Sequence, residues 1–299
     1  MNSKKPLFSS IHTHSTFCDG KDDIETMCRT AYERNLFIIG FSAHAPIERQ
    51  TGMISEWHLK DEKVEQYTAE VLAAKKRWQG KIKVFLGYEA DYIKNRRSPL
   101  DKDITSLNLD YIIGSVHYLF PENGTEPFTV DGSALEFEKG LKEGFNGDRK
   151  LLMHCYYDAI AEMIKMGGFD ILAHPDLLKK NCSGGNYWQQ EEETERQKEI
   201  ARLISGLNKA AGRTEIAVEV NTGGLNRKKI NEVYPSLTFL RILKDYNIPV
   251  IITADAHCAK DINGNYDIAL KTLISADFQE HVLFNGKVNG ISVWQKEVI

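Results

Sequence analysis

The feature that most constrains this fold is a series of seven short apolar runs separated by segments with helical periodicity. Two of the runs read Leu-Phe-Ile-Ile-Gly-Phe and Val-Ile-Ile-Thr-Ala, without the polar alternation of a strand that has one wet face. Strands buried on both faces have this composition, and they occur mainly in parallel sheets covered by helices. The expected strands are 7–15, 36–44, 84–92, 111–118, 169–176, 216–222 and 250–257.

Helical patterns fill most of the connections between these runs. The expected helices are 22–35, 60–78, 191–211 and 237–246, and 133–166 is expected to hold two helices with a break near 144–147. The connection 95–108 is shorter and has no clear helical pattern. Alternating strands and helices predict either an α/β barrel or a doubly wound sheet. Because no linker or internal repeat interrupts the pattern, we expect residues 1–299 to form a single domain.

Composition excludes several classes of partner. The net charge is -4 and the pI is near 6.2, which disfavours nucleic acid and anionic membranes as partners. No stretch approaches the roughly 18 apolar residues of a membrane span. The five cysteines form no C-x-x-C pair, and the polar N-terminus has no apolar signal region, so we expect a cytoplasmic protein with free thiols. Composition does not predict the oligomeric state.

Polar side chains of the kinds that bind metals occupy the C-terminal end of every expected strand. His12 and His14 lie two residues apart on the first strand, so their side chains share a face. The other strand ends carry His44, Glu89, Asp91, His117, His174, Asp176, Glu219, Asn221, Asp255 and His257. The C-terminal ends of barrel strands meet on one face, where active sites are built. The sequence therefore predicts one cluster of imidazoles and carboxylates.

This cluster has more donors than one metal ion needs. Six strand-end histidines together with Asp19, Glu89 and Asp255 give nine donors, enough for two or three ions if Glu89 and Asp255 bridge. Mixed imidazole and carboxylate ligation suits Zn, Mn or Fe. We expect Cys18 and Cys258 to be packed thiols rather than ligands, and His58 to be a loop residue without a chemical role.

The ordered motifs resemble those of one enzyme superfamily. The motifs are His12-Thr-His14, Asp19-Gly20, His44, Glu89, Gly-Ser-Val-His117, Ala-His174-Pro and Asp255-Ala-His257. In this order they are similar to the PHP (polymerase and histidinol phosphatase) superfamily, and in particular to its histidinol-phosphate phosphatase branch. The resemblance implies a distorted (β/α)7 barrel with up to three metal ions at the C-terminal ends of its strands.

Carried over residue by residue, the resemblance implies three sets of ligands. One metal would be held by His12, His14, Glu89 and Asp255. A second would be held by Glu89, His117 and His174. The third would be held by Asp19, His44 and His257. Many PHP members have a histidine where this chain has Asp19, so the third set is where this chain departs from the common pattern.

We expect a metal-dependent phosphatase that hydrolyses L-histidinol phosphate to L-histidinol and phosphate, a step of histidine biosynthesis. Two metals would bridge a water, lower its pKa toward about 7 and present hydroxide for in-line attack on phosphorus. Glu89, Asp255 and His257 are the expected catalytic residues, the last two near the leaving oxygen. No G-x-S-x-G nucleophile motif is present, in agreement with direct hydrolysis.

Loops after the strands supply candidates for substrate binding. Asn221 and Arg227 follow the sixth strand, and the guanidinium of Arg227 suits a phosphate. Weaker candidates for the phosphate are Arg49, Arg96 and Arg97. Candidates for the imidazole and amine of histidinol are Glu48, Tyr118, Phe120 and Asp131. The long polar loops 45–57 and 179–190 are either lids over the site or surface connections.

Other functions stay open at this stage. A PHP phosphoesterase of different specificity, such as a nucleotide phosphatase or a nuclease, would use the same ligands. A metal-dependent amidohydrolase commonly carries a bridging lysine where this chain has Glu89. A non-catalytic metal-binding PHP module is a further alternative. The tail around 286–294 is either a strand that closes the barrel or a surface turn.

Overall fold

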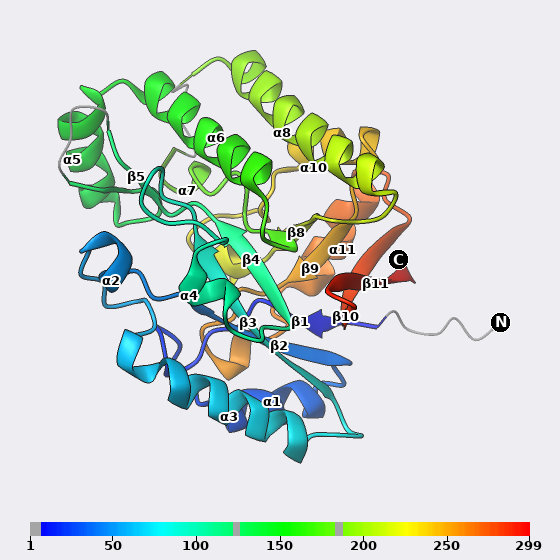
Figure 1. The fold of residues 1–299 in the computed structure, drawn as a ribbon. Helices are drawn as coiled ribbons and strands as arrows, with labels where there is room; N and C mark the ends of the chain where they lie inside the picture. Colours follow the sequence, from blue (N-terminus) through cyan, green and yellow to red (C-terminus); the bar gives the residue numbers. More distant parts are fainter. Residues whose placement is uncertain (1–6, 122–125, 183–187) are drawn as a thin grey trace.

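The computed structural model describes residues 7–121, 126–182 and 188–299 (Figure 1). Its framework is a parallel sheet whose strands lie beside one another in chain order. The strands are β1 (Ser9–Ser10), β2 (Ile38–His44), β3 (Lys83–Asp91), β4 (Tyr111–Ser115), β7 (Ile171–Leu172), β8 (Ala217–Asn221) and β9 (Val250–Thr253). Each predicted apolar run contributes one strand to this sheet.

The sheet closes into a barrel between its first and last strands. Thr13 pairs with Ala256 in a parallel bridge just beyond β1 and β9. The amide of His14 donates to the carbonyl of Ala256 over 2.9 Å, and the amide of Ala256 donates to the carbonyl of His12 over 3.1 Å. This closure confirms the distorted (β/α)7 barrel and rules out the doubly wound sheet.

Helices surround the barrel (Figure 1). The longer ones are α1 (Ile24–Glu33), α3 (Val64–Arg77), α5 (Ala134–Phe145), α6 (Arg149–Met166), α8 (Gln190–Ala211), α10 (Leu237–Asp245) and α11 (Tyr266–Ser275). The single-turn ones are α2 (Glu48–Thr51), η1 (Asp61–Lys63), α4 (Lys102–Thr105), α7 (Lys179–Cys182), α9 (Gly223–Asn226) and η2 (Ala259–Asp261). Within the described residues, no helix is both long enough and apolar enough to cross a membrane.

Local signals explain where several helices start and stop. The carboxylate of Asp23 accepts from the Thr26 amide at the start of α1, and Ser133 and Glu136 form a reciprocal capping box at the start of α5. The predicted break between α5 and α6 is confirmed, because Asn146 and Gly147 adopt left-handed φ angles of 53° and 75°. Helix α11, which starts without a side-chain cap, is not among the predicted helices.

A hairpin at the C-terminus closes the N-terminal end of the barrel. Strands β10 (Glu280–Val288) and β11 (Ile291–Val298) pair antiparallel. Val282, Leu283 and Phe284 of this hairpin join the cluster that fills the barrel, which includes Ile11 and Tyr111. Of the two expectations for the tail, the closing strand is therefore the one found. A second hairpin, β5 (Tyr118–Leu119) with β6 (Phe128–Thr129), follows β4.

The ring of Tyr111 occupies the barrel interior because two glycines leave room for it. A Cβ at Gly87 would lie 2.6 Å from carbons of this ring, and one at Gly40 would lie 2.6 Å from its hydroxyl oxygen. The hydroxyl donates to the carbonyl of Ile11 over 2.5 Å and so joins β4 to the segment that follows β1. The glycines therefore set the packing beneath the C-terminal end of the barrel.

A Gly87→Ala substitution should lower the free energy of unfolding by about 1–3 kcal/mol, because the added methyl group overpacks the barrel. Gly206→Ala is the matched control. Gly206 is exposed on α8 with open space around its Cβ position, so alanine there should stabilise the helix by up to about 1 kcal/mol. Urea unfolding followed by circular dichroism measures both; equal effects at the two positions would contradict the packing argument.

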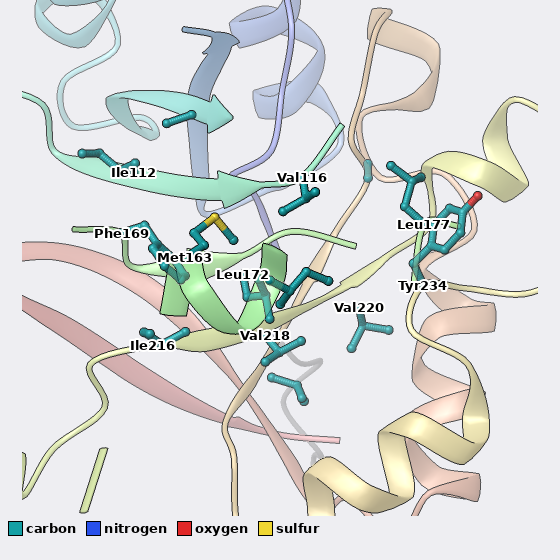
Figure 2. Close-up of a cluster of buried hydrophobic side chains, with 14 of the residues drawn as sticks. Ile112, Val116, Met163, Phe169, Leu172, Leu177, Ile216, Val218, Val220 and Tyr234 are labelled. Atoms are coloured by element: carbon teal, nitrogen blue, oxygen red, sulfur yellow. The ribbon is translucent and has the colours of Figure 1, made fainter. Parts of the chain in front are cut away.

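A second hydrophobic layer lies outside the sheet. Figure 2 shows part of it around β4, β7 and β8, where Leu172 and Val218 pack near Met163 of α6. At one side of this cluster Leu177 and Tyr234 lie together (Figure 2). Both of these residues also line the cleft at the C-terminal end of the barrel. The outer core therefore supports one wall of that cleft.

Candidate metal centre

A cavity of about 220 Å³ opens at the C-terminal ends of the strands. Seven of the nine predicted metal ligands line it: Asp19, His44, Glu89, His117, His174, Asp255 and His257. The remaining two, His12 and His14, are fully buried and contact these ligands from beneath. The structure thus brings all nine side chains into one cluster.

Glu89, at the end of β3, stands in the middle of the cluster. Its Oε2 lies 3.0 Å from His12 Nε2, 3.1 Å from His44 Nδ1 and 3.5 Å from His14 Nε2. None of these three nitrogens has a hydrogen-bond partner among the described residues, although all are buried. Buried polar atoms are rarely left unpaired in folded proteins. Three unpaired imidazole nitrogens around one carboxylate oxygen fit a divalent cation.

The other oxygen of Glu89 faces a different pair of imidazoles. Oε1 lies 3.1 Å from His174 Nε2 and 3.5 Å from His117 Nε2. A carboxylate whose two oxygens point at separate groups of nitrogens has the geometry of a bridging ligand. The donor set around Glu89 therefore fits at least two cations, in agreement with mixed imidazole and carboxylate sites for zinc and related metals.

Asp255, which follows β9, connects this group to the next. Its Oδ1 lies 3.3 Å from His14 Nε2, 3.6 Å from His12 Nε2 and 3.5 Å from His257 Nδ1. Its backbone has a φ of 46°, which is uncommon for a residue other than glycine and costs of order 1 kcal/mol. The chain therefore holds Asp255 in a strained conformation that turns its carboxylate into the cluster.

Asp19 is placed beside a third group of donors. Its Oδ2 lies 3.0 Å from His257 Nε2, and its Oδ1 lies 3.8 Å from His44 Nε2. The same Oδ1 is 3.6 Å from Nδ1 of His14, whose Nε2 faces Glu89 and Asp255. The third group is therefore adjacent to the first, and the His14 ring lies between them.

Opposite charges keep the carboxylates of the cluster ionised. Burial by itself raises the pKa of Glu89, but the surrounding histidines, chiefly His12 and His44, hold that pKa well below its usual range. Burial likewise raises the pKa of Asp255, and Arg227 together with His12 outweighs it and holds this pKa far below normal. Both carboxylates are thus available as metal ligands at neutral pH.

Three cationic side chains surround the cleft. Arg227, just after α9, pairs with Asp255 Oδ2 over 2.8 Å, and its Nη1 lies 2.9 Å from His257 Nδ1. Its side chain remains 35% exposed, so it can contact a ligand. Lys180 and Lys229 also line the cleft. The cluster of carboxylates and imidazoles therefore has positively charged side chains at its rim.

The chain matches the model of the PHP domain family over residues 10–223. It belongs to the PHP family. A Deinococcus radiodurans protein named probable histidinol-phosphatase is 27% identical over 263 residues, which cover 88% of this chain and 91% of that protein. This match extends well beyond the PHP domain itself.

Two solved structures share the fold. A Listeria monocytogenes protein with histidinol phosphatase as its proposed activity superposes with a TM-score of 0.73 at 22% identity, covering 87% of this chain and 98% of that one. The histidinol phosphate phosphatase of Lactococcus lactis, solved with zinc, L-histidinol and phosphate, gives a TM-score of 0.65 at 20% identity. That comparison covers 93% of this chain and 97% of the other. Most of the chain is therefore folded as in these two structures.

The thiols near this PHP site are not built as ligands. Cys18 Sγ lies 3.5 Å from His14 Nδ1, but burial raises the pKa of this thiol to about 12. The thiol of Cys258 donates to Asp261 Oδ2 over 3.0 Å, and burial with this carboxylate raises its pKa to about 11. Among the described residues, neither thiol belongs to a group of side chains whose donor atoms lie close enough together to hold one metal ion.

Asn221, which was predicted to bind substrate, is buried and does not line the cleft. The side chain is fully buried, its Nδ2 donates to Glu219 Oε1 over 2.7 Å, and its Oδ1 accepts from the Gly223 amide over 2.7 Å. Its amide is therefore used inside the protein and does not reach the cleft. Arg227, predicted from the same loop, does reach the cleft.

The weaker sequence candidates for the phosphate lie elsewhere. Arg49 is 74% exposed and pairs with Asp61, and buried Arg97 pairs with Asp101 and Asp103. Arg96 lies over the ring of Phe120, with its guanidinium carbon 4.0 Å from the ring centre. These three side chains are not among the described residues that line the cleft.

Among the candidates for the imidazole and amine, only Asp131 lines the cleft. Glu48 pairs with Lys60 instead, and Tyr118 and Phe120 pack near Arg96 around a separate cavity. The two long loops do contribute to the site, since Trp57 and Lys180 line the cleft. Residues 183–187 of the second loop lie outside the described part of the chain.

Sequence reasoning missed the contacts of two buried residues, one with a predicted ligand and one with Asp91. Glu219 accepts from His12 Nδ1 over 2.9 Å. His58 is buried, contrary to the expectation of a loop residue without a role, and its Nε2 lies 2.9 Å from Asp91 Oδ2. Asp91 is in turn 2.9 Å from His117 Nδ1, so it orients that ring, as its position at the end of β3 suggested. No short motif marks either contact, because both join residues that are distant in sequence.

Proposed function

We propose that this chain is a metal-dependent histidinol-phosphatase that hydrolyses L-histidinol phosphate to L-histidinol and inorganic phosphate. The observation that carries the proposal is the position of Glu89. Its two carboxylate oxygens face separate groups of imidazoles at the bottom of a cleft with a cationic rim. The Deinococcus radiodurans relative, which aligns with 88% of this chain, is named a probable histidinol-phosphatase. The Lactococcus lactis structure contains L-histidinol, phosphate and zinc.

The three groups of donors support three ligand sets. We assign His12, His14, Glu89 and Asp255 to one ion. We assign Glu89, His117 and His174 to a second. We assign Asp19, His44 and His257 to a third. Zinc is the first choice because the Lactococcus lactis structure holds it, and Mn or Fe would suit the same donors.

Divalent ions bound in these sets would supply Lewis acidity and an activated water. Within the chain, Arg227, Lys180 and Lys229 would hold the phosphate oxygens, with the planar fork of Arg227 giving the directional contact. The pairing of Arg227 with Asp255 fixes the guanidinium beside the carboxylate we assign to the first ion. His257, within reach of both Asp19 and Asp255, is placed to assist the leaving oxygen.

A second cavity supports the choice of a cationic alcohol as the leaving group. It measures about 750 Å³ and adjoins the cleft, with which it shares Asp19, Trp57, Asp131, Lys180 and Lys229. Its lining also includes Glu56 and Glu136. Carboxylates and an indole ring suit the ammonium and imidazole groups of histidinol.

The cysteines agree with the proposed cytoplasmic location. All five lie within the described residues, and no disulfide joins any of them. Such chains are common in reducing compartments. The small-molecule phosphate monoester is the only partner we propose.

The function is tested by phosphate release from purified protein loaded with zinc or manganese. L-Histidinol phosphate should be hydrolysed with a kcat/KM at least about 100-fold above those for a nucleoside monophosphate, a sugar phosphate and a short single-stranded DNA. Comparable rates on all substrates would assign a general PHP phosphoesterase instead. Stoichiometric zinc binding without hydrolysis of any substrate would assign a metal-binding module.

An Arg227→Ala variant should raise KM for L-histidinol phosphate by about 10- to 100-fold, because a charge-assisted contact to phosphate contributes about 1.5–3 kcal/mol. The fold should be retained, since the side chain is at the cleft surface. Steady-state kinetics measure the change. Arg49→Ala serves as the control, because Arg49 is exposed on the short helix α2, and its KM should be unchanged. An unaltered KM in Arg227→Ala would remove this residue from the phosphate site.

A further inference from the structure

Glu219 is a buried carboxylate whose capacity to accept hydrogen bonds is filled from within the protein. It lies on β8, below the cleft, and is fully buried. Oε2 accepts from His12 Nδ1 over 2.9 Å and from Thr253 Oγ1 over 3.0 Å. Oε1 accepts from the His174 amide over 2.8 Å and from Asn221 Nδ2 over 2.7 Å. With about four lone-pair sites on a carboxylate, Glu219 has none left for a metal.

This arrangement decides which nitrogen of His12 carries the proton. An ionised carboxylate can only accept, so Nδ1 of His12 must be the donor. Nε2 of the same ring is then the nitrogen left for a metal, and it lies 3.0 Å from Glu89 Oε2 without a hydrogen bond. Partners of this kind orient metal-bound histidines and raise their basicity.

We propose that Glu219 is a positioning residue of the metal centre, which keeps the His12 proton on Nδ1 and so reserves Nε2 for the metal. The inference rests on the proposed metal centre. Two other imidazoles are held differently: His174 Nδ1 is unpaired within the described part of the chain, and His14 Nδ1 faces only the thiol of Cys18 at hydrogen-bond distance. His117 Nδ1 has a carboxylate partner of its own, Asp91. Glu219 therefore acts on one ion of the cluster.

Hydrogen-bond donors around Glu219 fix the orientation of a glutamine at this position, so Glu219→Gln tests the proposal directly. The His174 amide and Asn221 Nδ2 are both donors, and Asn221 cannot flip because its Oδ1 accepts from Gly223. A glutamine must therefore place its oxygen at Oε1 and its NH2 group against His12 Nδ1. That NH2 group requires an unprotonated Nδ1, which moves the proton to Nε2 and blocks the proposed ligand atom.

Asp91→Asn is the matched comparison, because it removes a buried charge without reversing a tautomer. Asp91 Oδ1 accepts from both the amide and Nδ1 of His117, at 3.1 and 2.9 Å. An asparagine keeps its oxygen there and turns its NH2 group toward His58, which can accept at Nε2 and donate from Nδ1 to Ser55 Oγ. His117 thus keeps its proton on Nδ1. Asp170→Asn, at the opposite end of the barrel, controls for a buried carboxylate outside the site.

The experiment titrates metal-free protein with Zn²⁺ by calorimetry and competition with a chromophoric chelator. Glu219→Gln should weaken the binding of one ion by about 10- to 100-fold and leave the others within about threefold. Asp91→Asn should have a distinctly smaller effect, and Asp170→Asn none. Equal losses in Glu219→Gln and Asp91→Asn would show that charge, not the tautomer, matters and would overturn the proposal. If the wild type binds zinc and none of the three variants changes that binding, the proposal is also overturned.

A measurement on the wild type keeps the proposal falsifiable if the glutamine variant does not fold. Long-range ¹H–¹⁵N spectra of the zinc-loaded protein, with ring signals assigned by single histidine substitutions, report the tautomer directly. His12 should carry its proton on Nδ1; a proton on Nε2 would overturn the proposal. A wild type that binds no zinc at all would instead overturn the proposed function, and this inference with it.

Discussion

A Glu89→Gln enzyme should lose phosphatase activity by more than about 100-fold and bind fewer zinc ions than the wild type. A residue that merely supports a metal ligand typically contributes 10- to 100-fold, so a side chain proposed to bridge two ions should exceed that range. Glutamine offers only one oxygen in place of the two that face His12 and His174. Elemental analysis of purified protein and phosphate release measure the two effects.

The matched control is Glu162→Gln, which removes a carboxylate that pairs with Lys94 away from the cluster. It should keep both the metal content and the rate of the wild type. A Glu89→Gln enzyme with the metal content of the wild type would refute the bridging role of Glu89. Circular dichroism should show that both variants fold, because the metal-free cluster does not need this one negative charge to form the barrel.

Removal of metal should abolish activity and lower the melting temperature by about 10 °C. A ligand present at about 1,000 times its dissociation constant stabilises the folded state by about 4 kcal/mol, and in a chain of this size each kcal/mol shifts the melting temperature by about 2–4 °C. The unpaired nitrogens of His12, His14 and His44 are the groups that lose their partner. Chelator treatment followed by differential scanning calorimetry and a rate assay tests this.

The control for chelation is restoration. Zinc returned to the treated protein should recover both the melting temperature and the rate, whereas magnesium should not, since it prefers oxygen ligands in octahedral geometry. Full activity after exhaustive chelation, with metal content verified as zero, would exclude a metal-dependent reaction.

The strand-end ligands could be predicted because both of their determinants are visible in sequence. Alternation along an extended strand puts His12 and His14 on one face, and a parallel barrel gathers the C-terminal ends of its strands. The structure also places Glu89 and Asp255 between the histidines, where the family resemblance put them. The form of the C-terminal tail could be predicted only in part, because its sequence is compatible with both a closing strand and a surface turn.

What could not be predicted depends on contacts between distant segments. Asn221 and Glu219 lie two apart on β8, so they share a face, but sequence does not show that each would satisfy the other inside the protein. Lys180 and Lys229 reach the cleft from separate loops whose paths are not encoded in any periodic pattern. The burial of His58 could not be predicted, because it depends on Asp91, a hydrogen-bond partner that is remote in sequence.

The proposed metal centre lies where the first and last strands of the barrel meet. The Thr13–Ala256 bridge joins the segments that follow the first and last strands, and its neighbours are His12 and His14 on one side and Asp255 and His257 on the other. An ion bound between these side chains would add a second connection across this junction. Metal binding would therefore reinforce barrel closure, because an ion that holds His12 and His14 beside Asp255 also holds the first strand beside the last.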